Sequence, residues 1–393
     1  MHAQRIIQDL LDTDCPNIHA KRRRCVSVMV DAGSRGSLSL MGISRALSGS
    51  ISIRHRIKRC DRLLGNGKLD EDRLQIYKAM TRRLLQGLAQ PLIIVDWSDL
   101  HADRSHQLLR AALVVKGRAL TLYEEVHPIA KAQSPIVHRE FLHQLKNILP
   151  VDCHPIFVTD AGFRSPWFAL LSQFGYAWIG RIRNRDMVSA DERNWVGCKE
   201  LYFKAQSVAK DLGRFHYVRN NPTACRLIII KKKARCRHHT TLRGEVRTSS
   251  RSQKQAQGQT EPWLLVVSPK LSTLTAKAIV AIYSGRMQIE QTFRDIKNHR
   301  WGLGLSHSQT RMPNRLASLL LIGALACYAL WLIALTVRKS GYRIEFGSKK
   351  KAAHALSLIS LARWWVSEKL LITFSRRQIN EALILLRSMA LVV

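Results

Sequence analysis

The spacing of apolar residues divides this 393-residue chain into a helical beginning, a middle of mixed strands and helices, and a helical end. In residues 1–88, apolar positions recur at the helical period and are interrupted by Ser- and Gly-rich breaks. We expect five helices there, over residues 3–12, 18–33, 39–48, 53–64 and 69–87. This part is therefore predicted to form a helical domain.

From residue 91 onward the pattern changes to short, mainly apolar runs. Leu92–Val95 and Ile156–Thr159 are runs of the kind that buried strands contain. Residues 108–115 and 119–126 are joined by Lys116-Gly117-Arg118, which predicts a β-hairpin. The other elements expected in this stretch are helices at 134–149 and 165–174 and a strand at 176–182.

Residues 183–272 have the pattern of an insertion, after which the α/β pattern resumes with a helix over 275–298. Within the insertion we expect strands at 215–218, 225–230 and 263–267, and a mobile polar stretch at 231–261. The predicted domains are a helical domain at 1–88, a core at 89–182 and 273–311, a β-rich insertion at 183–272 and a C-terminal helical region at 312–393.

The helix expected at 275–298 gathers polar side chains of mixed chemistry on one face. At about 100° per residue, Tyr283, Arg286, Glu290 and Lys297 fall within an arc of roughly 60° beside an apolar stripe. An ordinary amphipathic helix with pairing between residues four apart would give a similar sequence. The functional interpretation depends on acidic residues elsewhere in the chain.

Two of the expected buried strands end in an aspartate, Asp96 and Asp160. If these strand ends lie side by side and the later helix adds Glu290, three carboxylates form an all-oxygen site suited to Mg²⁺, with Mn²⁺ as a substitute. Two such ions can support displacement at a phosphodiester. The alternative for both aspartates is ordinary turn chemistry at a strand end. Asp99 and Asp103 are rivals of Asp96, but they follow the apolar run and are expected on a solvated turn.

The charge of the chain points to a polyanionic partner, because 63 Lys and Arg against 28 Asp and Glu leave a net charge of +35. The helix expected at 53–64 concentrates this charge and, with the short helix before it, resembles a helix-turn-helix that faces DNA. Its candidate DNA contacts are Arg54, Arg56, Lys58, Arg59 and Arg62. The run Lys21–Arg24 is a further candidate for phosphate contacts. A solvated basic helix is the alternative.

Two features bear on where the protein is located. Leu316–Val337 is uncharged and long enough to span a bilayer, but its small and polar breaks and its single occurrence favour a buried helix. The eight cysteines form no CxxC pair and no secretory leader is evident, so we expect reduced intracellular thiols. The cluster Cys236–His239, with Cys225, has the wrong spacing for a zinc finger, and we interpret it as part of a basic surface.

Taken together, the strand order, the aspartates after the first and fourth strands and the glutamate on a later helix resemble the ribonuclease-H-like core of DDE transposases and retroviral integrases. The spacing Tyr283-x2-Arg286-x3-Glu290-x6-Lys297 matches the Tyr-Arg-Glu-Lys signature of insertion-sequence family 4. The stretches Val95–Asp99, Asp160–Phe163 and Asp61–Asn66 are also similar to members of that family. The resemblance covers roughly residues 15 to 310 and leaves the C-terminal 60 residues unmatched.

The resemblance implies an α/β fold and a cut-and-paste transposase of the bacterial cytoplasm and nucleoid, with no membrane partner. Asp96, Asp160 and Glu290 would be catalytic metal ligands, and Tyr283, Arg286 and Lys297 would contact phosphates near the cleaved end of the DNA. Trp263 looks like the counterpart of a tryptophan that stacks on a flipped base in relatives that form hairpins, although a core position on a strand is the alternative. The partners would be transposon ends, target DNA and a second copy of the chain, for whose interface the C-terminal helices are our candidate.

Two other functions remain open from the sequence. A metal-dependent endonuclease without strand transfer needs the same carboxylates, and only joined products distinguish it. A non-catalytic DNA-binding regulator needs the basic helical domain but gives no reason for acidic residues at two strand ends and on a polar helix face. The sequence does not specify the terminal repeats, the target site or the activity of this copy.

Overall fold

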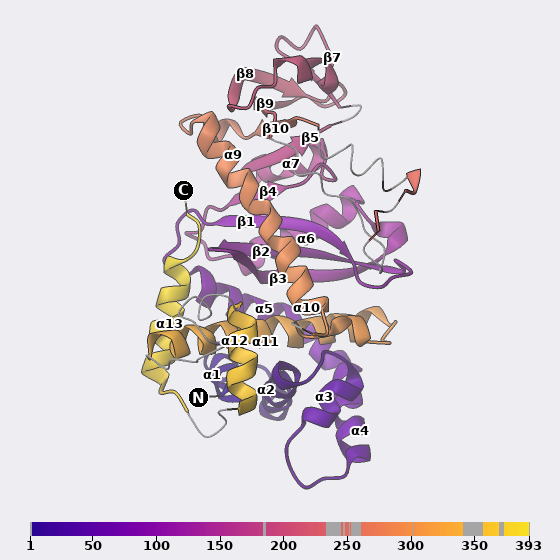
Figure 1. Cartoon of the computed structure of the whole chain (residues 1–393), viewed down its shortest axis with the longest axis vertical. Helices are drawn as coiled ribbons and strands as arrows, with labels where there is room; N and C mark the ends of the chain where they lie inside the picture. The colour runs from indigo at the N-terminus through magenta and orange to yellow at the C-terminus, as the bar shows by residue number, and fades with distance from the viewer. Residues whose placement is uncertain are drawn as a thin grey trace. The chain divides into compact units, whose positions relative to one another are not determined.

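The computed structural model describes residues 2–183, 186–232, 245–246, 248–250, 252, 261–300, 302–340, 357–368 and 373–392. The chain forms two compact units. The first comprises Met1–Cys153 with Met287–Val393, and the second comprises His154–Arg286. Each unit is described separately below, with the element labels of Figure 1.

The first unit begins with the five helices that the sequence predicted. They are α1 (Ala3–Asp14), α2 (Ala20–Arg35), α3 (Leu40–Ala46), α4 (Ile53–Leu64) and α5 (Gly67–Leu85). Polar side chains define where several of them start, because each accepts a hydrogen bond from a backbone N–H of the first turn. Ser39 caps α3 in this way, Ser52 caps α4 and Asn66 caps α5.

An antiparallel sheet of three strands follows, formed by β1 (Leu92–Asp99), β2 (His106–Val115) and β3 (Arg118–Pro128). The expected hairpin joins β2 and β3, and its glycine, Gly117, has a φ of 85°, which L-residues with a side chain rarely adopt. Strand β1 is longer than expected, because pairing with β2 continues to Asp99 opposite Gln107. A 3₁₀ turn (Ile129–Lys131) and α6 (Pro135–Ile148) complete this stretch.

Helix α11 (Pro313–Lys339) is the central element of the helical part of the first unit. It contacts α1, α2, α5, α12 (Leu358–Glu368) and α13 (Arg376–Ser388), and Figure 1 shows it running among them. Its length and hydropathy would suit a membrane span, but its most apolar 18-residue window is fully buried within the protein. The expectation of a buried helix at Leu316–Val337 is therefore confirmed.

The last residues of the chain are tied to the sheet of the first unit. Leu391 donates its N–H to the carbonyl of Val114 at 3.0 Å and accepts from the N–H of Leu92 at 3.0 Å. Lys116 donates to the carbonyl of Met389 at 2.9 Å. The C-terminal region, for which the sequence offered no motif, thus contributes hydrogen bonds to the start of β1 and the end of β2.

The second unit is built around one sheet, which combines two strands that precede the insertion with the strands of the insertion itself. Its strands are β4 (Ile156–Thr159), β5 (Ala177–Ile182), β6 (Met187–Ser189), β7 (Val196–Gly197), β8 (Lys210–Tyr217), β9 (Thr223–Ile230) and β10 (Trp263–Val267), in the order β4-β5-β10-β9-β8-β6-β7. Strands β4 and β5 are parallel, whereas β10 pairs antiparallel with both β5 and β9. The strands expected in the insertion are confirmed, and β6 and β7 were not expected.

The remaining elements of the second unit are α7 (Ser165–Gln173), the 3₁₀ helix η2 (Cys198–Lys204), the 3₁₀ turn η3 (Pro269–Leu271) and α9 (Ala276–Ser284). Helix α7 packs on β5, where Gly180 leaves room for the ring of Phe168: a Cβ at that glycine would lie 2.2 Å from the ring. Most of the stretch 231–261, which we expected to be mobile, lies outside the described residues, as does Cys236–His239.

The prediction of one continuous helix over residues 275–298 is wrong. The chain instead forms α9, a 3₁₀ turn η4 (Gly285–Met287) and then α10 (Gln288–Lys297). Gly285 lies at the junction as the residue that ends α9, and glycine is a weak helix former. The polar residues of the expected helix are therefore distributed over two helices and the turn between them.

Candidate active site

Asp96 lies near the carboxyl end of β1, in the first unit. It is partly buried, and its Oδ1 accepts a hydrogen bond from the N–H of Trp97 at 2.8 Å. Its partner across the sheet is Arg110 on β2. Residues paired in this way project to the same face of a sheet. Arg110 lies 4.9 Å from the ring of Phe293 on α10, so Asp96 shares the face of the sheet that α10 covers.

Trp97 projects to the opposite face, where α6 packs. Its Nε1–H donates to Nε2 of His138 at 3.0 Å, and its ring also meets the ring of His127 at 5.7 Å. Burial, with a smaller effect of His127, lowers the pKa of His138 to about 4, so this imidazole is neutral at pH 7 and can accept the indole hydrogen. Trp97 therefore packs against α6 and holds the strand directly beside Asp96.

Glu290 is the second acidic residue that the first unit supplies. It lies exposed in the first turn of α10, a helix that contacts β1, β2 and β3 (Figure 1). Thr292 donates its hydroxyl to the carbonyl of Ala119 at 2.6 Å, and Asp295 pairs with Arg118 at 2.9 Å. Both contacts attach α10 to the start of β3. The sheet therefore fixes the helix that carries Glu290 on the same face as Asp96.

A buried ion pair lies beneath this helix, and only a weak signal in the sequence indicates it. Arg110 and Glu124 are 2.5 Å apart, and the relative exposures of their side chains are 0% and 1%. Tyr77 on α5 donates its hydroxyl to the other oxygen of Glu124 at 3.0 Å. Phe293 of α10 rests on the guanidinium of Arg110. Two charged residues within otherwise apolar strand runs were the one available signal, since an unpaired buried charge would be too costly.

Lys297 joins the other end of α10 to β1. Its ammonium donates to the Ser98 hydroxyl at 2.8 Å and to the carbonyl oxygen of Asp99. Burial and, to a smaller extent, the nearby Arg110 lower the pKa of Lys297 to about 8, against the opposing effect of Asp99. The phosphate contact expected for Lys297 remains a prediction. In this structure its ammonium is bound to the protein itself.

The acidic residues considered as alternatives to Asp96 have other partners. Asp99 belongs to β1 rather than to the solvated turn that we expected, and it accepts from the Gln107 amide at 2.7 Å. Asp103 lies in the following turn and pairs with Arg311 at 2.8 Å. The cross-strand partner of Asp96, Arg110, contacts α10. The structure shows no such link for Asp99 or Asp103 within the described residues.

Asp160 belongs to the second unit and directly follows β4. Its Oδ1 accepts from the N–H of Gly162 at 2.8 Å, a local contact within the turn that follows β4. Within the described ranges, no three His, Cys, Asp or Glu side chains form a group that could hold a metal. The convergence of Asp96, Asp160 and Glu290 thus stays a prediction, although carboxylates are the donors that Mg²⁺ and Mn²⁺ favour.

Two further signature residues lie in the second unit with Trp263. Tyr283 is buried near the end of α9, and Arg286 is partly buried in η4. Trp263, partly buried at the start of β10, meets the Tyr283 ring edge-on at 5.0 Å. The ammonium of Lys232 lies 4.0 Å from the centre of the Trp263 ring and donates to the Ser284 hydroxyl at 2.6 Å. Trp263 is thus only partly a core residue, and a cation covers its ring.

The N-terminal helices form a basic groove of about 680 Å³ between α2 and α4. Its lining residues include no aspartate or glutamate, and they are His19, Lys21, Arg22, Cys25, Ile51, His55, Lys58, Arg59, Arg62, Leu63 and Asn66. Three of the five predicted DNA contacts on α4 therefore face one groove. Arg54 is exposed but does not line it. A groove that is positively charged along both walls can follow the phosphates of a nucleic acid.

Arg56, the fifth predicted contact, binds the protein instead. Its guanidinium donates to the carbonyl of Leu47 at 2.6 Å, to that of Ile51 at 3.0 Å and to that of Gly49. These three carbonyls belong to the turn between α3 and α4. Arg56 therefore fixes how α4 follows α3, and its role in DNA contact is a prediction that no observation here tests.

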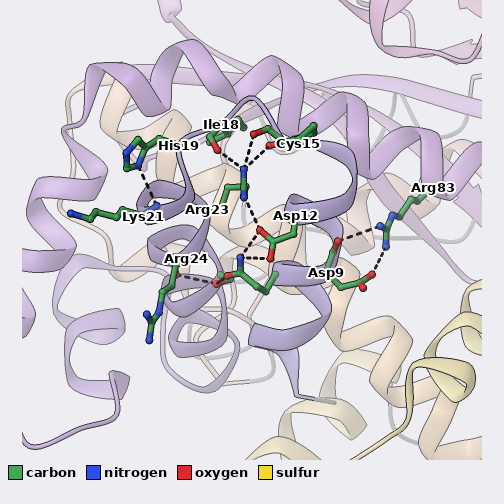
Figure 2. A network of polar contacts seen from close by, with 12 residues as sticks. Asp9, Asp12, Cys15, Ile18, His19, Lys21, Arg23, Arg24 and Arg83 are labelled. Carbon is green, nitrogen blue, oxygen red and sulfur yellow. Dashed lines mark hydrogen bonds and ion pairs between the residues drawn. The ribbon is translucent and has the colours of Figure 1, made fainter.

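The basic run Lys21–Arg24 also divides into structural and outward-facing residues. Figure 2 shows Arg23 donating to Asp12 at 2.8 Å and to the carbonyl of Ile18 at 2.6 Å, which ties α2 to α1. Arg22 pairs with Asp72. The side chains of Lys21 and Arg24 point away from this network (Figure 2). Only part of the run is therefore directed at solvent, where a phosphate could be bound.

Comparison with known proteins gives one match. A family model described as "Transposase DDE domain" matches residues 87–329, which is more than half of the chain. No curated protein matches the chain. The matched range contains β1 with Asp96, the turn after β4 with Asp160 and the helix α10 with Glu290.

Proposed function

Since this chain belongs to the DDE transposase family, we propose that it is the cut-and-paste transposase of a bacterial insertion sequence. DDE transposases are metal-dependent enzymes that break and join DNA strands, and this chain is one of them. The proposed reaction cleaves both ends of the element through a hairpin intermediate and joins the freed 3′ ends to target DNA. Two copies of the chain would bring the two ends together.

The narrower assignment rests on sequence similarity. The signature Tyr283, Arg286, Glu290 and Lys297 supports insertion-sequence family 4. The resemblance to the transposase of the tetracycline-resistance composite transposon rests on four stretches, Val95–Asp99, Asp160–Phe163, Arg286–Glu290 and Asp61–Asn66. Both assignments are part of the proposal.

One observation carries the catalytic part of the proposal. Asp96 shares a face of the sheet with α10, and α10 presents Glu290 there while Thr292 and Lys297 attach it to the strands. With Asp160, these carboxylates would hold two Mg²⁺ ions, and Mn²⁺ would replace them. Bound metal supplies the charge that activates the attacking oxygen and stabilises the leaving oxygen. The protein positions the carboxylates, which would otherwise repel one another.

The DNA would be bound by groups outside the carboxylate site. Lys58, Arg59 and Arg62 line the basic groove and would contact phosphates of the terminal repeats. Tyr283, Arg286 and Lys297 would contact phosphates near the cleaved bond. Trp263 would stack on a base that leaves the duplex when the hairpin forms. Lys297 would have to exchange its contacts with Ser98 and Asp99 for a phosphate oxygen.

The test is a cleavage assay with purified protein, Mg²⁺ and linear DNA that carries the end of the element. Wild type is compared with Glu290→Gln, with Asp96→Asn and with Glu71→Gln, a control at an exposed carboxylate that pairs with Lys68. We expect hairpin and joined products from wild type and from the control. Both site variants should bind the DNA end as wild type does and form at least about 100-fold less product, because each loses a ligand of the metal site.

Each other result identifies a different function. Equal products from wild type and Glu290→Gln would remove Glu290 from the site. Nicked products without hairpins or joining would identify an endonuclease. Specific end binding without any cleavage in Mg²⁺ or Mn²⁺ would identify a DNA-binding regulator.

A further inference from the structure

Phe203 is an aromatic side chain that the protein leaves in solvent. It lies on η2 in the second unit with a relative exposure of 81%, and in the described ranges no other Phe, Tyr or Trp is classed as exposed. Five residues later, Val208 is 73% exposed. Single exposed apolar residues are common on protein surfaces. An exposed ring and an exposed aliphatic residue on one short loop are less common, and a binding partner that covers them would explain their exposure.

The backbone around Phe203 is held in place, so its exposure does not come from a loose loop. Cys198 and Leu201 of η2 are buried, and the N–H of Cys198 donates to the Asp186 carbonyl at 2.8 Å. The Glu200 side chain accepts from the N–H of Gly197 at 2.8 Å, which caps the start of η2. On the other side, Lys231 donates its N–H to the Gln206 carbonyl at 2.7 Å. The ring is therefore presented from an anchored segment.

The surroundings of this ring are positively charged. The ammonium of Lys204 lies 5.7 Å from its centre, and Lys231 follows β9 beside the same loop. Lys199 and Lys210 are exposed on either side of it in the sequence. Of the nearby acidic residues, Glu200 is used in the cap, and Asp211 is paired with Arg226 at 2.5 Å. An apolar ring within a lysine rim fits a polyanion with flat apolar groups better than it fits a protein surface.

The loop is linked to Trp263 through the end of β9. Lys231 is bonded to the loop, and the next residue, Lys232, places its ammonium 4.0 Å from the centre of the Trp263 ring. Trp263 in turn contacts Tyr283. Phe203 and Trp263 are thus two aromatic side chains of one unit, joined by consecutive lysines.

We propose that Phe203 packs against an unpaired base of bound DNA, as a second aromatic contact in addition to Trp263, with the exposed Val208 of the same loop as a further apolar contact. The proposal rests on the proposed function, because it requires a DNA end whose base pairs open. Aromatic side chains in a cationic surface bind bases by stacking without regard to sequence, and apolar side chains can occupy the space of a disrupted base step. The four lysines would neutralise the phosphates on both sides of that base.

The experiment compares two fluorescein-labelled DNA duplexes of the same sequence, one fully paired and one with a single unpaired thymine. Fluorescence anisotropy gives the Kd of each for wild type, Phe203→Ala, Phe203→Trp and Val151→Ala at one salt concentration. Val151 is the matched control, because it is 88% exposed and lies in the first unit. Phe203→Ala should weaken binding to the duplex with the unpaired base about 5- to 100-fold and leave the Kd of the paired duplex within about 2-fold. Phe203→Trp and Val151→Ala should behave as wild type.

Four results would overturn the proposal. Equal Kd values for wild type and Phe203→Ala on the unpaired duplex would exclude the contact. An equal loss on both duplexes would show that the ring contacts paired DNA, and a change in oligomeric state would show that it meets a second copy. If wild type binds neither duplex, the proposed function itself fails, and this proposal fails with it.

Discussion

Removing the carboxylate of Glu124 should be one of the most damaging single changes in the protein, although no ligand is expected to touch it. Glu124 balances the charge of Arg110, and neither side chain has contact with solvent. In Glu124→Ala the guanidinium would stay buried without a counter-charge, and Tyr77 would lose its acceptor. Loss of one partner of a buried ion pair costs about 3–5 kcal/mol. Total stabilities are about 5–15 kcal/mol, so this variant would approach the limit of folding.

The same change should also reduce activity, because Phe293 of α10 rests on Arg110, and Glu290 lies one turn earlier on that helix. We expect denaturant unfolding to show the loss of about 3–5 kcal/mol for Glu124→Ala. The double variant Arg110→Met with Glu124→Leu removes both charges and should recover most of that stability. DNA-end cleavage by the folded fraction should remain low in the single variant, since α10 loses its support.

The control for this reasoning is an exposed pair. Lys68 and Glu71 are 3.0 Å apart with side-chain exposures of 68% and 65%, so Glu71→Ala should cost no more than about 1 kcal/mol. A loss below about 1 kcal/mol for Glu124→Ala would refute the idea that its charge is needed in the core. A double variant as unstable as the single one would show that packing, rather than charge balance, determines the cost.

Three further predictions concern other parts of the chain. The pKa of His138 is about 4, below the usual value of 6.5, so its contribution to stability is complete above about pH 6.5 and is lost as the pH falls towards 4. His138→Gln should therefore flatten the pH dependence of the free energy of unfolding in that window. An unchanged profile would contradict the burial argument. Arg24→Ala should reduce the salt dependence of DNA binding by about one phosphate contact without loss of stability. Arg23→Ala should instead lower the melting temperature, because it removes the contacts with Asp12 and Ile18. The reverse result would exchange the roles of the two arginines. Gly180→Ala should destabilise the second unit by about 1–3 kcal/mol, because the new Cβ would lie 2.2 Å from the Phe168 ring, and an unchanged melting curve would show that α7 can move.

The sequence was sufficient for the parts of the fold that depend on local pattern. The five N-terminal helices were predicted because their apolar residues repeat at the helical period and polar residues such as Ser52 and Asn66 cap them. The β2–β3 hairpin was predicted because Gly117 supplies the positive φ of a tight turn. The burial of α11 followed from its small and polar breaks, and the structure packs it against α1, α2, α4, α5, α12, α13 and β3. In each case, the element is determined by residues that lie close together in the sequence.

Features that depend on contacts between distant residues could not be predicted in this way. The sequence shows that Arg110 and Glu124 interrupt apolar strands, but only the register of β2 and β3 shows that they face each other. The fifth predicted DNA contact, Arg56, has the composition of a surface residue, yet it binds three carbonyls of a turn. The break at Gly285 was also missed, because one glycine costs only about 1 kcal/mol within a helix and its position was compatible with a continuous one.

The contacts of α10 explain how the short helix that carries Glu290 is held in place. α10 has only ten residues, too few for an isolated helix to be stable in water. Its stability must come from the sheet, and the attachments are spread along its length: Thr292 to β3, Phe293 to Arg110, Asp295 to Arg118 and Lys297 to the end of β1. Glu290, the residue of this helix that is proposed as a metal ligand, precedes all four and remains exposed. The helix is thus fixed by its later turns, and its first turn is left exposed, as the proposed metal site requires.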